Sequence, residues 1–128
     1  MIRSILAVVA GVVTWIVAAT VLNVGLRLGL PGYVDAEPTM AFTLPMLVGR
    51  LAIALATSVL AGAACGWVGR GSGKAGWAFA VLMLLLFVPL HLKLWHAFPV
   101  WYHLFFLLTL APTLLMGVAL GRRRARQG

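Results

Sequence analysis

Acidic side chains are almost absent from this sequence, since Asp35 and Glu37 are the only two among 128 residues. Charged residues of both signs make up 9% of the chain, whereas a soluble domain carries about a quarter. Acid–base catalysis by paired carboxylates therefore has one candidate pair, and no serine or cysteine lies in a recognisable nucleophile motif. The sequence predicts a protein that is not an enzyme.

Cysteine is nearly absent as well. Cys65 is the single one, which excludes an intramolecular disulfide, and its apolar neighbours predict a packing role. A phosphate-binding glycine loop is also lacking, because the glycine-rich segment 69–74 follows an apolar run rather than a strand. Neither a disulfide scaffold nor a nucleotide-binding protein is indicated.

Apolar residues, by contrast, dominate the chain at 63%. A transmembrane helix needs about 20 predominantly apolar residues. Four segments approach or exceed this length without any Asp, Glu, Lys or Arg: 4–26, 51–68, 75–92 and 100–120. The sequence predicts an all-α integral membrane protein whose four transmembrane helices form an antiparallel bundle, as a single domain over residues 1–128.

The centres of these segments hold no acid, base or histidine. A proton-coupled carrier needs an ionisable group inside the membrane, and the few serine, threonine and asparagine side chains are too scattered for an obvious aqueous pore. We therefore expect a dry bundle. A small transporter or channel is a less favoured alternative.

Basic residues report how the chain crosses the membrane, because cytoplasmic segments near span ends carry the excess of Lys and Arg. Seven lie on one side of the predicted spans: Arg3, Arg70, Lys74, Arg122, Arg123, Arg124 and Arg126. Three lie on the other: Arg27, Arg50 and Lys93. Both termini are therefore predicted to be cytoplasmic.

The net charge of +8 does not indicate nucleic-acid binding, because the basic residues are distributed between apolar spans rather than gathered on one accessible face. The run Arg122–Arg126 is the exception. It can attract anionic lipid of the bilayer at about 1 kcal/mol per basic residue. The expected partners are thus the lipid bilayer and anionic lipid at the C-terminal tail, with no nucleic acid.

The longest predicted connection, 29–44, lies on the outer side. Pro31 and Gly32 are expected to end the first helix, and Pro38 and Pro45 suit helix starts. The pattern predicts a short interfacial helix or turn near residues 38–42. It leads into the second span.

Small residues recur every four positions on two of the spans. The second span carries Ala54, Ser58, Gly62 and Gly66, and the fourth carries Thr109, Thr113, Gly117 and Gly121. Such faces let helix backbones approach closely in lipid. Packing within the bundle is the favoured interpretation, and a dimer seam is the alternative.

All three histidines lie in one short segment with two tryptophans, and His91 and His103 flank the outer hairpin at matching depths while His96 lies between them. Imidazoles that converge could bind zinc or copper, or hold a haem iron. Their spacing matches no established ligand motif, and an interfacial hydrogen-bonding role explains them equally. No cofactor is the favoured expectation.

A second polar group on the outer side is a charge cluster. Its predicted members are Arg27, Asp35, Glu37, Arg50 and Lys93. A charge near hydrocarbon needs a partner, so Arg50 is expected to pair with Asp35 or Glu37. Binding of anionic lipid or substrate is the alternative.

The hairpin reading Phe98-Pro99-Val100-Trp101-Tyr102-His103-Leu104 and the four spans resemble small four-helix bacterial membrane proteins. The resemblance implies the bacterial inner (cytoplasmic) membrane. The leading functional hypothesis is a non-enzymatic accessory or structural subunit of a membrane assembly, or a homo-oligomer. The alternative is a metal- or haem-binding redox module that uses the outer histidines.

The predicted topology can be tested with reporter fusions after Gln127 and at Ala36. Because the basic residues number seven against three, a cytoplasm-active reporter should work at the first site and an export-dependent reporter at the second. The reverse pattern of reporter activity would refute the orientation.

Overall fold

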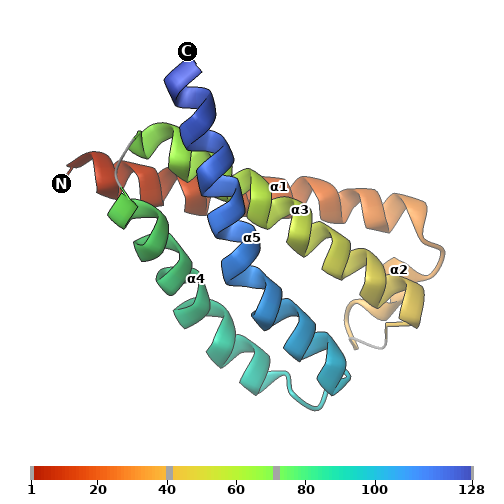
Figure 1. Cartoon of the computed structure of the whole chain (residues 1–128). Helices are drawn as coiled ribbons and strands as arrows, with labels where there is room; N and C mark the ends of the chain where they lie inside the picture. Colours follow the sequence, from red (N-terminus) through yellow and green to blue (C-terminus); the bar gives the residue numbers. More distant parts are fainter. Residues whose placement is uncertain (1, 40–41, 71–72, 128) are drawn as a thin grey trace.

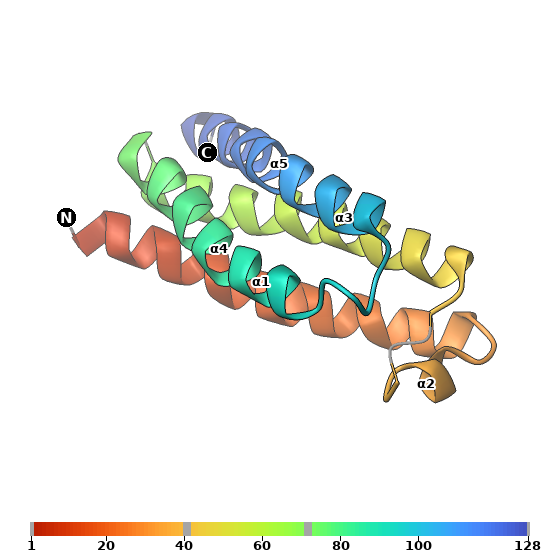
Figure 2. The same ribbon diagram turned by 90° about the horizontal axis from the view of Figure 1, so that it is seen from below.

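The computed structural model describes residues 2–39, 42–70 and 73–127 (Figure 1). Throughout these ranges the regular elements are helices: α1 (Ile2–Gly29), α2 (Tyr33–Ala36), α3 (Leu44–Gly69), α4 (Gly73–Lys93) and α5 (Val100–Gln127). Four of them are long and apolar enough to cross a membrane. The chain is therefore an all-helical, multi-pass membrane protein, and its two ends lie toward the same end of the molecule (Figures 1 and 2).

Helix α3 begins at Leu44, seven residues before the apolar segment predicted from position 51. Pro45 lies in its first turn, where a missing N–H costs no hydrogen bond and the fixed φ favours helix. Because Arg50 is charged, the second span was predicted to begin after it, at residue 51. Arg50 instead lies inside the helix.

The connection between α1 and α3 also differs from the prediction. Gly32 adopts a left-handed conformation with φ 80°, which glycine accepts without steric cost, and the chain turns there directly into α2. The short helix thus occupies 33–36 rather than 38–42. Met40 and Ala41 of the predicted segment lie outside the described residues, as do Gly71 and Ser72 of the turn between α3 and α4.

Helices α3 and α5 form the closest pair in the bundle, with backbone against backbone (Figure 2). A Cβ atom at Gly62 or Gly66 would overlap a backbone carbonyl oxygen of α5. Equally, a Cβ at Gly117 or Gly121 would overlap a carbonyl oxygen of α3. The glycines of both predicted small-residue faces therefore lie in this seam, inside one chain.

The hydroxyl groups of these faces are satisfied within their own helices. Ser58 donates to the Ala54 carbonyl at 2.6 Å, and Thr113 donates to the Thr109 carbonyl at 2.6 Å. Thr109 does the same to the carbonyl of residue 105. They add no interhelical hydrogen bond, so close backbone contact is what the seam relies on.

Helix α1 is apolar on nearly every side and lies at the edge of the bundle. Ala7 and Gly11 are its buried residues, and the Phe79 ring of α4 packs on Gly11, where a Cβ would lie 2.7 Å from the ring. Large side chains such as Val17 and Val21 are more than half exposed. In a bilayer, lipid covers these side chains.

Enlarging a seam glycine should destabilise the bundle. Gly62→Leu and Gly117→Leu should each lower the free energy of unfolding by at least the typical overpacking cost, about 1–3 kcal/mol, because the neighbouring atoms are backbone and cannot rotate away. Gly25→Leu is the matched control, since nothing lies within 4 Å of a Cβ at that position. Thermal unfolding in detergent measures all three; equal melting temperatures would show that the seam tolerates side chains.

Candidate functional site

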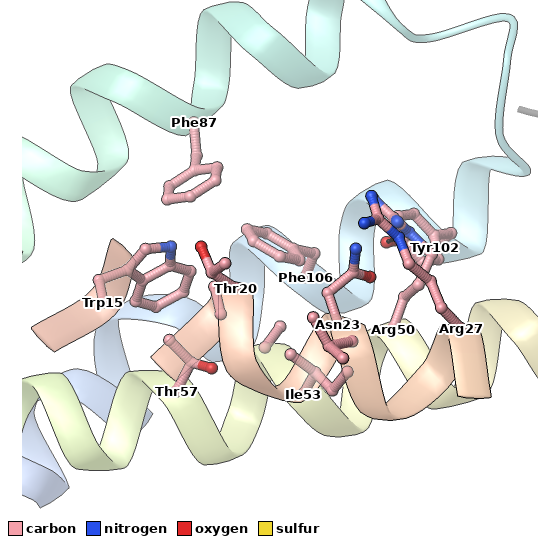
Figure 3. Close-up of a pocket in the computed structure, with 13 residues that line it drawn as sticks. Trp15, Thr20, Asn23, Arg27, Arg50, Ile53, Thr57, Phe87, Tyr102 and Phe106 are labelled. Atoms are coloured by element: carbon pink, nitrogen blue, oxygen red, sulfur yellow. Dashed lines mark hydrogen bonds between the residues drawn. The ribbon is translucent and has the colours of Figure 1, made fainter. Parts of the chain in front are cut away.

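A cavity of about 380 Å³ opens between the four long helices, toward the end of α1 that carries Arg27 (Figure 3). Helices α1 and α3 contribute most of its wall, and α4 and α5 complete it. Its lining residues are Trp15, Ala19, Thr20, Asn23, Val24, Arg27, Arg50, Ile53, Ala54, Thr57, Phe87, Tyr102 and Phe106. Polar side chains gather at one end and aromatic rings toward the other.

Arg50 is the centre of the polar end. Its Nε donates to the Tyr102 hydroxyl at 3.2 Å and its Nη1 to the Tyr33 hydroxyl at 2.9 Å. The guanidinium carbon lies 4.8 Å from the centroid of the Phe42 ring and 5.8 Å from that of Phe98, which adds cation–π attraction. Within the described residues no carboxylate forms an ion pair with it. Its positive charge is therefore solvated but not neutralised.

Within the described residues, the hydrogen bonds around Arg50 leave several N–H and O–H groups without a partner. The Tyr33 oxygen accepts from Arg50, so its own O–H donates to Asn23 Oδ1 at 2.9 Å. The Oδ1 atom of Asn23 is thus engaged, and its NH₂ group makes no hydrogen bond within the described residues. Two of the five N–H groups of the guanidinium are used, and Tyr102 keeps its O–H. This end of the cavity offers N–H and O–H groups beside a positive charge, which suits an anion.

The predicted ion pair of Arg50 with an acid is wrong, because Glu37 pairs with Arg27 instead. Arg27 Nε and Nη2 donate to the two carboxylate oxygens at 2.7 and 2.9 Å. The left-handed turn at Gly32 folds the connection back along the end of α1, which brings Glu37 to Arg27 rather than to α3. Asp35 is exposed on the outside of α2.

The hydrogen bond from Arg27 holds the pKa of the Glu37 carboxyl below its ordinary value. A carboxyl with a lowered folded-state pKa stabilises the fold above its unfolded pKa and loses that effect as the pH falls through the lowered value. The pair is exposed, so it tethers the connection loosely. Lys93, the remaining member of the predicted charge cluster, is exposed at the end of α4.

The deeper end of the cavity is aromatic. The rings of Trp15 and Phe87 lie 5.2 Å apart and those of Phe87 and Phe106 lie 5.1 Å apart, between centroids. Thr57 is fully buried, and its hydroxyl has no hydrogen-bond partner among the residues that the structure describes. A dry bundle was predicted, and the structure adds a cavity to it. The signals for this cavity in the sequence are two polar-tipped residues at span centres, Trp15 and Thr57.

The histidines form a separate arrangement. His91 Nδ1 and His103 Nδ1 lie 2.7 Å apart, and His103 Nε2 lies 3.2 Å from the Trp95 carbonyl oxygen. A carbonyl accepts, so His103 carries its proton on Nε2, and for the neutral ring Nδ1 then accepts from His91. The Trp95 ring also stacks on His103 at 4.9 Å between centroids. Both imidazoles are buried, and these hydrogen bonds fix their tautomers.

The three histidines considered as metal ligands do not all meet at the hairpin. His96 is exposed, and no group of three His, Cys, Asp or Glu side chains suited to a metal occurs in the described ranges. Bonds of about 2.0–2.1 Å from zinc to each nitrogen would push the two Nδ1 atoms apart from their 2.7 Å contact. The distance suits a hydrogen bond.

No family model, curated protein or solved structure matches this chain. A function can therefore be proposed only from the side chains of the chain itself. In the histidine pair the two facing Nδ1 atoms are engaged with each other, whereas donor groups around Arg50 have no partner within the described residues. The cavity is the stronger candidate site.

Removing one member of the histidine pair should destabilise the hairpin. His103→Ala leaves a buried N–H of His91 without an acceptor, which should cost about 1–3 kcal/mol of unfolding free energy. His96→Ala, at an exposed position, should leave the melting temperature unchanged. The same preparations should be colourless and free of zinc, copper and iron by elemental analysis. Near-stoichiometric metal that disappears on replacing His91 and His103 together would instead support the redox alternative.

Proposed function

We propose that this chain is a non-enzymatic protein of the bacterial inner membrane that binds the anionic head of a lipid-like molecule in the Arg50 cavity. Through this binding it would act as an accessory or structural subunit of a membrane assembly, or as a homo-oligomer. Four apolar helices support the membrane location. The excess of basic residues on one side supports an antiparallel bundle with both termini in the cytoplasm.

One observation carries this proposal: Arg50 is half-buried and positively charged, and its described partners are hydroxyl groups and aromatic rings rather than carboxylates. A cation at membrane depth is costly unless it is paired or hydrated. An anion that enters the cavity would complete its coordination. The free NH₂ of Asn23 and O–H of Tyr102 would then hydrogen-bond the same anion.

The position of the cavity favours a ligand that arrives from the membrane. Thr20, Val24 and Arg27 line it and are exposed on α1, so one wall faces the surface that lipid covers. In the proposed topology, Arg27 and Arg50 stand toward the outer leaflet. A head group would reach Arg50 while an apolar chain lies against Phe87 and Phe106.

The depth of the cavity favours binding over passage. Its lining reaches Trp15 and Thr57, which lie near the middle of α1 and α3. A transporter or channel would need a polar path through the other half of the membrane. In that half the glycine seam brings α3 and α5 into backbone contact.

Two further surfaces support the proposed accessory role. Helix α1 exposes large apolar side chains along its length, and lipid or a helix of a partner protein can cover them. At the other end, Arg123, Arg124 and Arg126 are exposed on the last turns of α5, where they can attract anionic lipid. The chain thus offers contacts to the membrane at both faces.

Arg50→Gln should weaken binding of an anionic amphiphile. A fatty carboxylate titrated into the protein in zwitterionic nanodiscs should bind the variant about 10-fold to 100-fold more weakly, because a charge-assisted hydrogen bond is worth about 1.5–3 kcal/mol. Lys93→Gln is the matched control: it removes a cation from the same end of the molecule, but at an exposed position outside the cavity lining.

Comparing the two variants distinguishes a specific anion site at Arg50 from general attraction by the net charge of the protein. If both weaken binding equally, attraction by net charge explains the affinity and the cavity proposal fails. Arg50→Lys keeps the charge but loses the planar fork that bonds Tyr33 and Tyr102 together, so it should bind between the wild type and Arg50→Gln. A melting temperature within a few degrees of wild type establishes that each variant is folded.

A further inference from the structure

The deep end of the Arg50 cavity holds a buried hydroxyl group, on Thr57, that differs from the hydroxyl groups of four other helix residues. In four other helix residues the hydroxyl donates to the carbonyl oxygen four residues earlier, at 2.6–2.7 Å: Thr20, Ser58, Thr109 and Thr113. Thr57 is fully buried and makes no such bond within the described residues. An unpaired polar group in hydrocarbon is costly, so this one calls for a partner that enters the cavity.

Trp15 provides a second donor at the same depth. Its half-buried ring contacts Phe87 at 5.2 Å between centroids, and in Figure 3 its nitrogen lies on the side toward Thr20. Tryptophan usually gathers at membrane interfaces, where water satisfies its N–H, but Trp15 lies near the middle of α1. Figure 3 marks no hydrogen bond between this N–H and the other residues that line the cavity.

The two ends of the cavity are separated by similar distances along α1 and α3, the two helices that form its main wall. From Arg50 to Thr57 is seven residues of α3, or about 10 Å at 1.5 Å per residue, and from Asn23 to Trp15 is eight residues of α1, or about 12 Å. Figure 3 shows Trp15 and Thr57 at one end, Asn23, Arg27, Arg50 and Tyr102 at the other. Donors therefore stand in two groups, with Ile53 and Phe106 between them.

We infer that the ligand carries two separated polar groups: an anion for Arg50 and a second hydrogen-bond acceptor for Thr57 and Trp15, about 10–12 Å away along an apolar chain. This inference rests on the proposed function and specifies its ligand class. A fatty carboxylate with a hydroxyl or keto oxygen near the middle of its chain has this form. The oxygen accepts from the Thr57 O–H or the Trp15 N–H, and methylene groups contact the apolar wall.

The ester oxygens of an ordinary diacyl phospholipid do not match this spacing. They lie a few bonds from the phosphate, so a head group on Arg50 would leave them near Ile53 rather than near Thr57. A plain acyl chain would cover both deep donors without an acceptor, which is costly for each. The separation of the donor groups therefore distinguishes oxygenated chains from both.

Three probes test the inference in phosphatidylcholine nanodiscs: stearate, a hydroxystearate substituted near mid-chain, and its isomer with the hydroxyl next to the carboxylate. The mid-chain compound should bind wild-type protein about tenfold more tightly than stearate, the equivalent of one well-formed hydrogen bond. The isomer has the same composition but places its oxygen beside Arg50. It should bind like stearate.

Variants at the deep end should remove the preference without removing binding. Thr57→Val keeps the side-chain shape and Trp15→Phe keeps an aromatic ring beside Phe87. In the double variant stearate no longer covers unpaired donors, so the preference for the mid-chain compound over stearate should be lost. Arg50→Gln should weaken all three probes together and retain the preference for the mid-chain compound.

The outcomes separate the two proposals. If the three probes bind wild type equally, the deep donors are hydrated and the inference is overturned, while the anion site at Arg50 stands. If none binds wild type measurably, the anion site is overturned and the deeper site falls with it. A preference for the mid-chain compound that remains in the folded double variant also overturns the inference. Another part of the protein would then bind the mid-chain oxygen of the ligand.

Discussion

The charge on Arg50 is the constraint around which the half of the molecule that holds the cavity is arranged. Arg50 is a residue of α3, one of the helices that can span the membrane. An unsolvated cation there would be costly. Two hydroxyl groups and two aromatic rings surround it, from the first connection, the second hairpin and α5. These segments are far apart in the sequence. They meet because one charge requires partners from several directions at once.

The glycine seam complements this polar end. Where α3 and α5 touch through Gly62, Gly66, Gly117 and Gly121, no space remains between their backbones. Nearer Arg50, α5 carries the large residues Tyr102 and Phe106, which line the cavity. Residue size alone thus divides the bundle into a closed half and a half that holds a cavity.

Much of the architecture follows from local composition. Hydropathy locates four helices because the cost of placing a charge in hydrocarbon is set by each segment independently of its neighbours. Boundaries were less accurate where a charged residue continues a helix: Arg50 shortened the predicted second span, and the arginines after Leu120 shortened the fourth. For His91, His96 and His103, matching depth correctly indicated a meeting for the first and last, but the direction of His96 depends on the path of the hairpin.

The sequence by itself determined that this is a helical membrane protein, that its spans number four, and that small residues occupy one face of two of them. Those properties are sums over single segments. Only the tertiary structure decided that Glu37 pairs with Arg27, that Arg50 is left without a carboxylate, and that Trp15 and Thr57 stand at the same depth of one cavity. The physical reason is that rotation and register between helices come from packing of distant residues, and a pattern read along one helix does not contain them.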